Sequence, residues 1–486
     1  MKNFNKILFR GTIAVSIANA GSQIVGLLLL PLFTEYLSPK EFGIISMVSM
    51  IVTFLALLYN PGIMSGTMRL FHATESENER KFLVGSANKF FVFIPILPLV
   101  VGLIWGEAIF SFIFKDFDFY PYGFLSLLLA FLIQPSRMWS TLMTLLYKIE
   151  KTAFLTAISV ILGLITAVVL IVVFDLGAMG RVLAMFVPAI FLYIISFFSI
   201  KRYTKGVWSF ESMKKQLIFG LPLIVGLWAY QGLSFFGKYF LEQMSSLEDV
   251  GIYTVGTILA SIPMLLVLGF KQLWAPIFYE NMNSKSYKTI TKLIKSFTVV
   301  ISILSLSLIL FIKEIVLLLI DSNYYSVIKI IPILVLASFF NGLLTISNSF
   351  LSFNNNFFRI SLFGLIASLL NILLNLVLIP IYGVLGASIA LVISYFIFYI
   401  LGVISERKKI SLVQNKKSAY IPPLLLVVGV LGNLLINENI FLNNFSFYEF
   451  FTKIFYLIFT IIVFFKIKII EKKDFISIIN LISRKK

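Results

Sequence analysis

Long apolar stretches follow one another along almost the whole chain, separated by short polar segments, and they constrain its fold more than any other feature. A helix that crosses a membrane needs about 20 mostly apolar residues. The stretches do not alternate apolar and polar residues, as the strands of a membrane barrel do. We therefore predict an all-α integral membrane protein. The fourteen predicted membrane-spanning helices lie near residues 11–33, 43–64, 83–105, 121–146, 154–174, 180–200, 216–237, 250–270, 293–312, 327–351, 358–379, 384–403, 419–436 and 450–466.

The composition excludes several classes of protein. Apolar residues make up 59% of the 486 residues and charged residues 13%, whereas soluble domains are about 45–50% apolar and about 25% charged. This excludes a water-soluble enzyme, a nucleic-acid reader and a disordered regulator. Cysteine is absent and His72 is the single histidine, which excludes a disulfide framework and the common cysteine or histidine metal sites. We expect no bound cofactor.

The positive charge follows the pattern of membrane topology. The net charge is +18, with 40 lysines and arginines. If the N-terminus lies in the cytoplasm, most of these residues fall in cytoplasmic loops, and the outer loops hold only Lys40, Lys115, Lys238 and Lys313. Cytoplasmic loops of membrane proteins carry such an excess. We therefore predict cytoplasmic N and C termini and an even number of spans.

An internal repeat divides the chain. Residues 38–43 (Ser-Pro-Lys-Glu-Phe-Gly) recur as residues 246–251 (Ser-Leu-Glu-Asp-Val-Gly), 208 positions later. A Gly-x-x-Gly-x-x-x-Ala pattern at 177–184 recurs at 383–390, an offset of 206. Matches at two such similar offsets indicate a duplication of six spans. Because six is even, the two copies have the same orientation, which is the parallel-repeat plan of rocking transporters.

The repeat predicts three parts of the chain. Residues 1–204 form an N-terminal six-helix lobe, and residues 205–410 form a C-terminal six-helix lobe. Residues 411–486 contain two further helices and an amphipathic, lysine-rich cytoplasmic tail. Such a tail is suited to an anionic membrane surface.

The motifs resemble one family of membrane proteins. Residues 30–43 (LPLFTEYLSPKEFG), Gly177-x-x-Gly180 and Pro380-x-x-Gly383-x-x-Gly386-Ala387 are similar to the polysaccharide-transport branch of the MOP superfamily, whose O-antigen and capsule members are called Wzx-type flippases. The resemblance covers essentially the whole chain, and its motifs are structural. It implies transfer of polyprenyl-diphosphate-linked oligosaccharides across the cytoplasmic (inner) membrane by alternating access, for O-antigen, capsule or exopolysaccharide. The lipid II flippase branch looks similar, and there the two extra helices shape a groove for a lipid tail.

The resemblance also implies the partners. They are the polyprenyl-diphosphate-linked oligosaccharide and the phospholipid bilayer. Polysaccharide polymerase machinery is a third partner left open, and no nucleic acid is expected. A coupling ion, sodium or proton, stays open.

The sequence leaves two other functions open. A membrane glycosyltransferase or polysaccharide polymerase would need acidic residues, and Asp116 and Asp118 form an acidic pair in an outer loop. The short outer loops and the duplication argue against that function. MATE-type drug and cation antiporters commonly keep a buried acid in the first or seventh span. No Asp or Glu lies at mid-depth in either span of this chain, which disfavours an antiporter.

Arg137 is the strongest candidate for contact with substrate. It lies inside the predicted span 121–146, directly after Pro135 and Ser136. An arginine within a membrane costs at least about 2.5 kcal/mol on insertion scales, so it usually faces a cavity or a partner. A diphosphate needs such a cation. The alternative is that Arg137 bonds the backbone freed by the proline or reaches toward the cytoplasmic interface.

Further candidates are cations at the cytoplasmic mouth and amides at mid-depth. Amides suit sugar hydroxyls because they both donate and accept hydrogen bonds. Anchoring by positive charge and hydrogen bonds between helices are the alternatives. The cations, which end two equivalent spans, are Arg69 and Lys271, and the amides are Asn19, Gln23, Gln231, Asn341 and Asn348.

Overall fold

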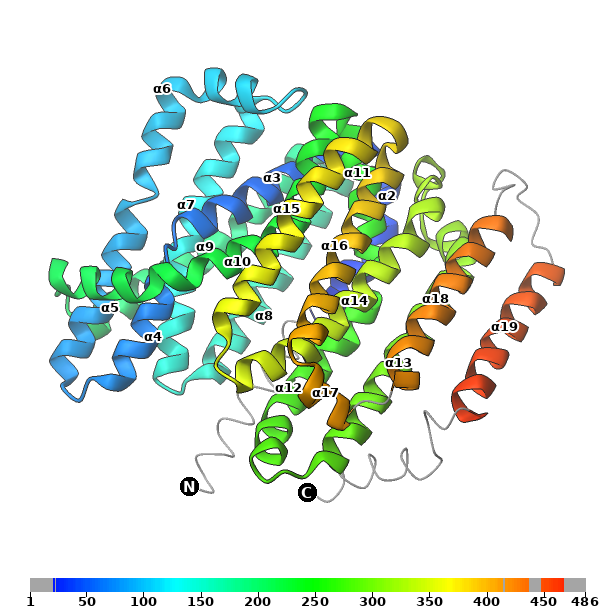
Figure 1. Ribbon diagram of the computed structural model, residues 1–486. Helices are drawn as coiled ribbons and strands as arrows, with labels where there is room; N and C mark the ends of the chain where they lie inside the picture. Colours follow the sequence, from blue (N-terminus) through cyan, green and yellow to red (C-terminus); the bar gives the residue numbers. More distant parts are fainter. Residues whose placement is uncertain (1–20, 22, 414–415, 437–446, 467–486) are drawn as a thin grey trace. The chain divides into compact units, whose positions relative to one another are not determined.

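The computed structural model consists of helices, and it describes residues 21, 23–413, 416–436 and 447–466. The described residues contain no β-strand, so the predicted all-α membrane fold is confirmed. The helices in Figure 1 are α2 (Leu30–Tyr36), α3 (Pro39–Leu58), α4 (Ile63–Ala73), α5 (Glu77–Phe93), α6 (Ile96–Ile113), α7 (Phe124–Leu145), α8 (Ile149–Val168), α9 (Gly177–Thr204), α10 (Phe210–Met244), α11 (Leu247–Ala260), α12 (Ile262–Asn283), α13 (Tyr287–Leu319), α14 (Val327–Phe353), α15 (Phe357–Tyr382), α16 (Val384–Ser405), α17 (Arg407–Val413), α18 (Lys416–Ile436) and α19 (Phe447–Lys466).

Ten segments of the described chain are long and apolar enough to cross a membrane. Helices also occupy every one of the fourteen predicted regions, and of the first, residues 11–20 and 22 lie outside the described residues. The predicted span 250–270 is divided, because α11 ends at Ala260 and α12 begins at Ile262. The predicted cytoplasmic tail, residues 467–486, lies outside the described residues.

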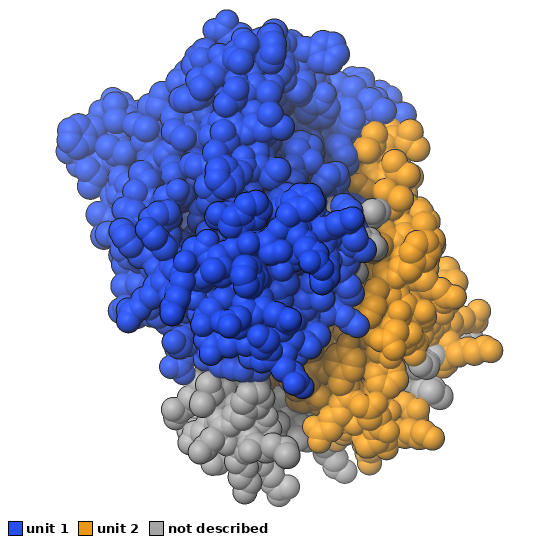
Figure 2. Space-filling model, turned by 90° about the vertical axis from the view of Figure 1, so that its left-hand side faces the viewer, with its two compact units in different colours: residues 1–254, 375–384 blue, residues 255–374, 385–486 orange. Residues whose placement is uncertain are grey.

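The chain packs into two compact units (Figure 2). Unit 1 comprises residues 1–254 and 375–384, and unit 2 comprises residues 255–374 and 385–486. These units are defined by which helices pack together, whereas the predicted division at 204/205 is defined by the repeat. The predicted division therefore stays a prediction.

In unit 1, α7 packs on α3, α5 and α9, and α4 packs on α10. The apolar core there includes Phe91, Trp139 and Ile200. In unit 2, α13 packs on α12, α14, α18 and α19.

The two copies of the repeated motif lie against each other in unit 1. Each begins its helix with a serine cap, because the Ser38 hydroxyl accepts from the Glu41 N–H at 3.4 Å and the Ser246 hydroxyl accepts from the Asp249 N–H at 3.1 Å. Such caps satisfy free backbone donors at helix starts. A Cβ on the first motif's glycine, Gly43, would overlap the carbonyl of Leu247, so only glycine permits this approach.

The same contact recurs with the copies exchanged. A Cβ on Gly251 would overlap the carbonyl of Pro39. Beside the glycines, the Thr254 hydroxyl lies 2.7 Å from the Ser46 hydroxyl. The glycines of the repeat therefore serve close packing between its two copies.

Candidate functional site

A groove of about 240 Å³ runs between α3 and α10 within unit 1. Helix α3 contributes its second half, and α10 contributes the stretch from Trp228 to Lys238. Its wall consists of Ser49, Met50, Thr53, Phe54, Leu57, Leu58, Trp228, Gln231, Gly232, Ser234, Phe235, Phe236 and Lys238.

The polar groups of the groove differ in whether they form hydrogen bonds within the protein. The hydroxyls of Ser49 and Thr53 donate to carbonyls of their own helix, at 2.9 and 2.8 Å. Within the described part of the chain, neither the Lys238 ammonium nor the Gln231 amide makes a hydrogen bond or an ion pair. An ionised lysine in a membrane helix is costly unless water or an anion meets it. The groove therefore presents one cation and one amide to whatever occupies it.

Aromatic rings form the rest of the wall. The Phe54 and Phe235 ring centroids lie 5.0 Å apart across the groove, and the Phe235 ring stacks on Tyr239 at 6.2 Å. The Trp228 side chain is 41% exposed. A cation beside broad apolar faces suits a ligand that is both anionic and amphipathic.

Arg137 lies inside α7, as predicted, but it is not part of the groove. It is half-buried and shares one face of α7 with Ser136, Ser140 and Thr144, all of them at least partly exposed. No other described residue accepts a hydrogen bond from its guanidinium or forms an ion pair with it. A stripe of hydroxyls and one arginine is unsuited to lipid, so this face is suited to water or a polar ligand.

The other predicted residues of unit 1 lie apart from the groove, except Gln231. Gln23 is exposed on a helix, and Asn19 lies outside the described residues. Arg69 lies in α4, where its guanidinium carbon is 4.9 Å from the centre of the Phe219 ring. That contact supports a packing role for Arg69.

In unit 2 the predicted residues lie on two helices. Lys271 is exposed and lies well inside α12 rather than at the end of a span, because this helix continues through polar residues to Asn283. Asn341 and Asn348 are half-buried in α14. The Asn348 carbonyl oxygen is buried without a hydrogen-bond partner in the described structure.

Lys238 was not among the predicted candidates, although it lines the groove. The apolar stretch suggested a span ending at residue 237 and put Lys238 in an outer loop, whereas α10 continues to Met244. The signal was present, because Gln231, Ser234 and Lys238 are spaced three and four apart and so share one helix face.

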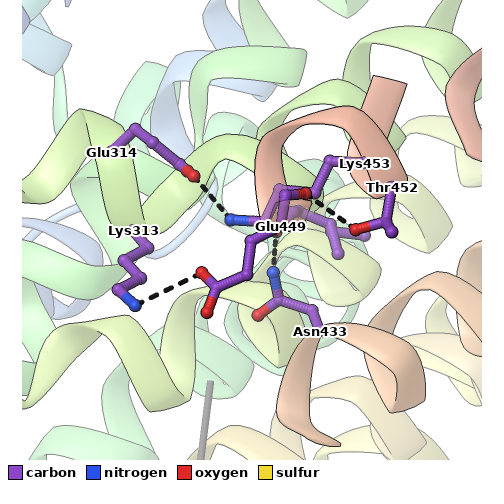
Figure 3. Close-up of polar contacts among 7 residues, drawn as sticks. Lys313, Glu314, Asn433, Glu449, Thr452 and Lys453 are labelled. Carbon is purple, nitrogen blue, oxygen red and sulfur yellow. Dashed lines mark hydrogen bonds and ion pairs between the residues drawn. The ribbon is translucent and has the colours of Figure 1, made fainter. Parts of the chain in front are cut away.

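A second group of charges lies in unit 2, where α13 meets α19 (Figure 3). The ammonium of Lys453 lies 2.6 Å from the Glu314 carboxylate, and that of Lys313 lies 3.5 Å from the Glu449 carboxylate. The Lys453 side chain is 1% exposed. The two lysines and two glutamates turn toward one another and balance their charges, so this cluster joins the helices.

No group of three or more His, Cys, Asp or Glu side chains that could hold a metal ion occurs among the residues described. Asp116 uses its backbone N–H to donate to the Glu242 carboxylate at 2.6 Å.

The fold is that of MOP-superfamily membrane transporters. It resembles the lipid II flippase MurJ in an inward closed conformation, with a TM-score of 0.71, 18% identity, and coverage of 94% of this chain and 98% of that chain. An inward-facing multidrug resistance MATE transporter gives a TM-score of 0.61 at 14% identity, covering 82% and 95%. A MOP transporter from Pyrococcus furiosus gives 0.57 at 16%, covering 84% and 97%.

A family model described as polysaccharide biosynthesis protein matches residues 8–282, more than half of the chain. The chain therefore belongs to the polysaccharide biosynthesis protein family. No curated protein matches its sequence.

Proposed function

We propose that this protein transfers a polyprenyl-diphosphate-linked oligosaccharide from the inner to the outer leaflet of the cytoplasmic membrane. The observation that carries the proposal is the groove between α3 and α10, whose Lys238 has no partner among the described residues. A diphosphate is the part of such a lipid that most needs a cation in a membrane. Membership of the polysaccharide biosynthesis family and the fold shared with a lipid II flippase support the same proposal.

The groove suggests a role for each kind of side chain. Lys238 would receive the diphosphate, and the Gln231 amide would bond sugar hydroxyls. Arg137, on its polar face of α7, would be a second cation along the path. Gln23, Asn19, Arg69, Lys271, Asn341 and Asn348 remain proposed contacts of lower priority, and α18 and α19 would flank the lipid tail. The protein would work by alternating access and perform no covalent chemistry.

The test is a deletion in the host, followed by analysis of lipid-linked oligosaccharides in each leaflet. We expect complete repeat units held on the cytoplasmic face and loss of the surface polymer. The wild-type gene should restore export, and the Lys238→Ala variant should not. Lys215→Ala is the matched control, because Lys215 lies on the same helix in an exposed ion pair with Glu211.

Two outcomes would overturn the proposal. Oligosaccharides that reach the outer leaflet but stay unpolymerised would indicate a polymerase. An unchanged lipid pool with new drug sensitivity would indicate a MATE-type antiporter, whose fold is also similar.

A further inference from the structure

A buried carboxylate joins the end of α10 to the loop that follows α6, within unit 1. The side chain of Glu242 is 0% exposed. One of its oxygens accepts the backbone N–H groups of Lys115 at 2.7 Å and Asp116 at 2.6 Å. Two successive N–H groups on one carboxylate oxygen form a small anion-binding site made of backbone. By the charge pattern, this contact lies on the outer side of the membrane.

Neighbouring residues strengthen the same contact. Gln243 donates to the carbonyl of Ile113 and, at 3.1 Å, to the second Glu242 oxygen. The Lys115 ammonium reaches the carbonyl of Ser245 at 3.1 Å. The side chains of Glu242 and Gln243, in the last turn of α10, thus both bind this one short loop.

Contacts between rings connect this junction to the groove. The Phe114 ring of the loop meets Tyr239 edge to face, with centroids 6.2 Å apart. Tyr239 stacks on Phe235, which lines the groove. Lys238 precedes Glu242 by four residues, or about 6 Å along the helix. A movement of the outer end of α10 away from the loop would therefore move the groove wall that carries Lys238.

The chemistry of the junction suits a contact that opens and closes. A carboxylate and backbone amides are both well hydrated once separated, and the ring contact of Phe114 with Tyr239 would part together with them. Hydrogen bonds to charged groups nevertheless favour the closed state by tenfold or more. Binding of substrate at the neighbouring groove could supply a bias of that size.

We propose that Glu242 is a latch that keeps the outer end of α10 closed on residues 113–116, and that the groove opens outward only when this latch parts. This proposal rests on the proposed function, because binding of the transported substrate is what would open the latch. It is independent of which lipid is carried.

The natural absence of cysteine allows a direct test. Ser234 lines the groove and is exposed, so a Ser234→Cys protein can be labelled in intact cells with a membrane-impermeant maleimide. We expect Glu242→Ala to raise the initial labelling rate by roughly tenfold, and the isosteric Glu242→Gln to raise it less. Glu248→Ala is the matched control, since Glu248 is an exposed acid a few residues away and should leave the rate unchanged. An unchanged rate in Glu242→Ala, at a normal level of protein in the membrane, would overturn the latch.

A second experiment decides the matter if Glu242→Ala does not accumulate. Lys115→Cys and Ser245→Cys, bridged by a short cleavable bis-maleimide, would hold the loop on α10. We expect loss of surface-polymer export in bridged cells and its return after cleavage. Continued export by fully bridged protein would contradict the latch. Failure of the proposed function is distinguishable, because it would appear as an unchanged lipid pool in the deletion strain, while the labelling test needs no knowledge of the substrate.

Discussion

The two units treat the lysines within their helices in opposite ways. In unit 2, Lys453 and Lys313 each meet a glutamate, and Lys453 is almost fully buried. In unit 1, the groove lysine Lys238 has no such partner in the described structure. A charge that stays within a membrane must be balanced from somewhere. The paired lysines are balanced by the protein, which makes them structural, and Lys238 is left to be balanced by a ligand.

This comparison predicts different consequences of removing each lysine. Loss of one partner from a buried pair leaves an uncompensated charge, which costs more than the pair ever contributed. Loss of a lysine that has no partner costs the fold little. Removing a paired lysine of unit 2 should therefore lower stability, whereas removing Lys238 of unit 1 should lower transport.

The largest expected effect on stability is that of Lys453→Ala. It would leave Glu314 charged, with one oxygen already buried and without a hydrogen-bond partner in the described structure, at a cost of about 3–5 kcal/mol. The melting temperature of the purified protein in detergent should fall steeply. The double variant Glu314→Lys with Lys453→Glu should recover part of the loss. An unchanged melting temperature would show that the cluster is not structural.

Next comes Lys238→Ala, whose effect should fall on transport alone. Export of surface polymer should drop by about a hundredfold, as expected when a charged contact worth about 3 kcal/mol is lost. The melting temperature should not fall. Lys238→Arg, which keeps the charge, should retain part of the activity. A fall in melting temperature as steep as that of Lys453→Ala would contradict the claim that Lys238, unlike Lys453, is not needed for stability.

Arg137→Ala should have the third effect. Surface polymer should be lost by tenfold or more while the protein inserts at normal levels, because Arg137 has no partner to leave behind among the described residues. Arg137→Lys separates bulk charge from the two-pronged geometry of a guanidinium. Full export by the alanine variant would remove Arg137 from the path.

The smallest effect should be that of Gln231→Leu. A neutral hydrogen bond contributes about 0.5–1.5 kcal/mol, so export should fall by only about twofold to tenfold. Transport of radiolabelled lipid in vesicles would resolve such a change. A loss equal to that of Lys238→Ala would mean that the amide, rather than the charge, dominates recognition.

The fold could be predicted from the sequence because one physical rule decides it. Every backbone polar group in lipid must be paired, so each long apolar stretch becomes a helix. The repeat placed Gly43 and Gly251 at equivalent positions, and the structure shows that both glycines allow close packing. Where a helix ends could not be predicted from apolar residues alone, because polar residues such as Lys271 continue a helix once it has begun.

The candidate site could be predicted only in part. Gln231 was predicted from its depth in the span, and it lines the groove. Lys238 was not predicted, because the predicted span ends at residue 237, one residue before it. The pairing of Glu314 with Lys453 joins residues 139 positions apart, and a single sequence contains no signal for such a contact.

The most direct test of the account is flipping by the purified protein in liposomes. The substrate would be the lipid-linked oligosaccharide that accumulates in the deletion strain, and the rate at which it becomes accessible in the opposite leaflet would be measured. We predict rapid flipping by the wild-type protein and by Lys215→Ala, and flipping near the protein-free rate by Lys238→Ala. Equal rates for Lys238→Ala and the wild-type protein would contradict the claim that the groove lysine receives the substrate.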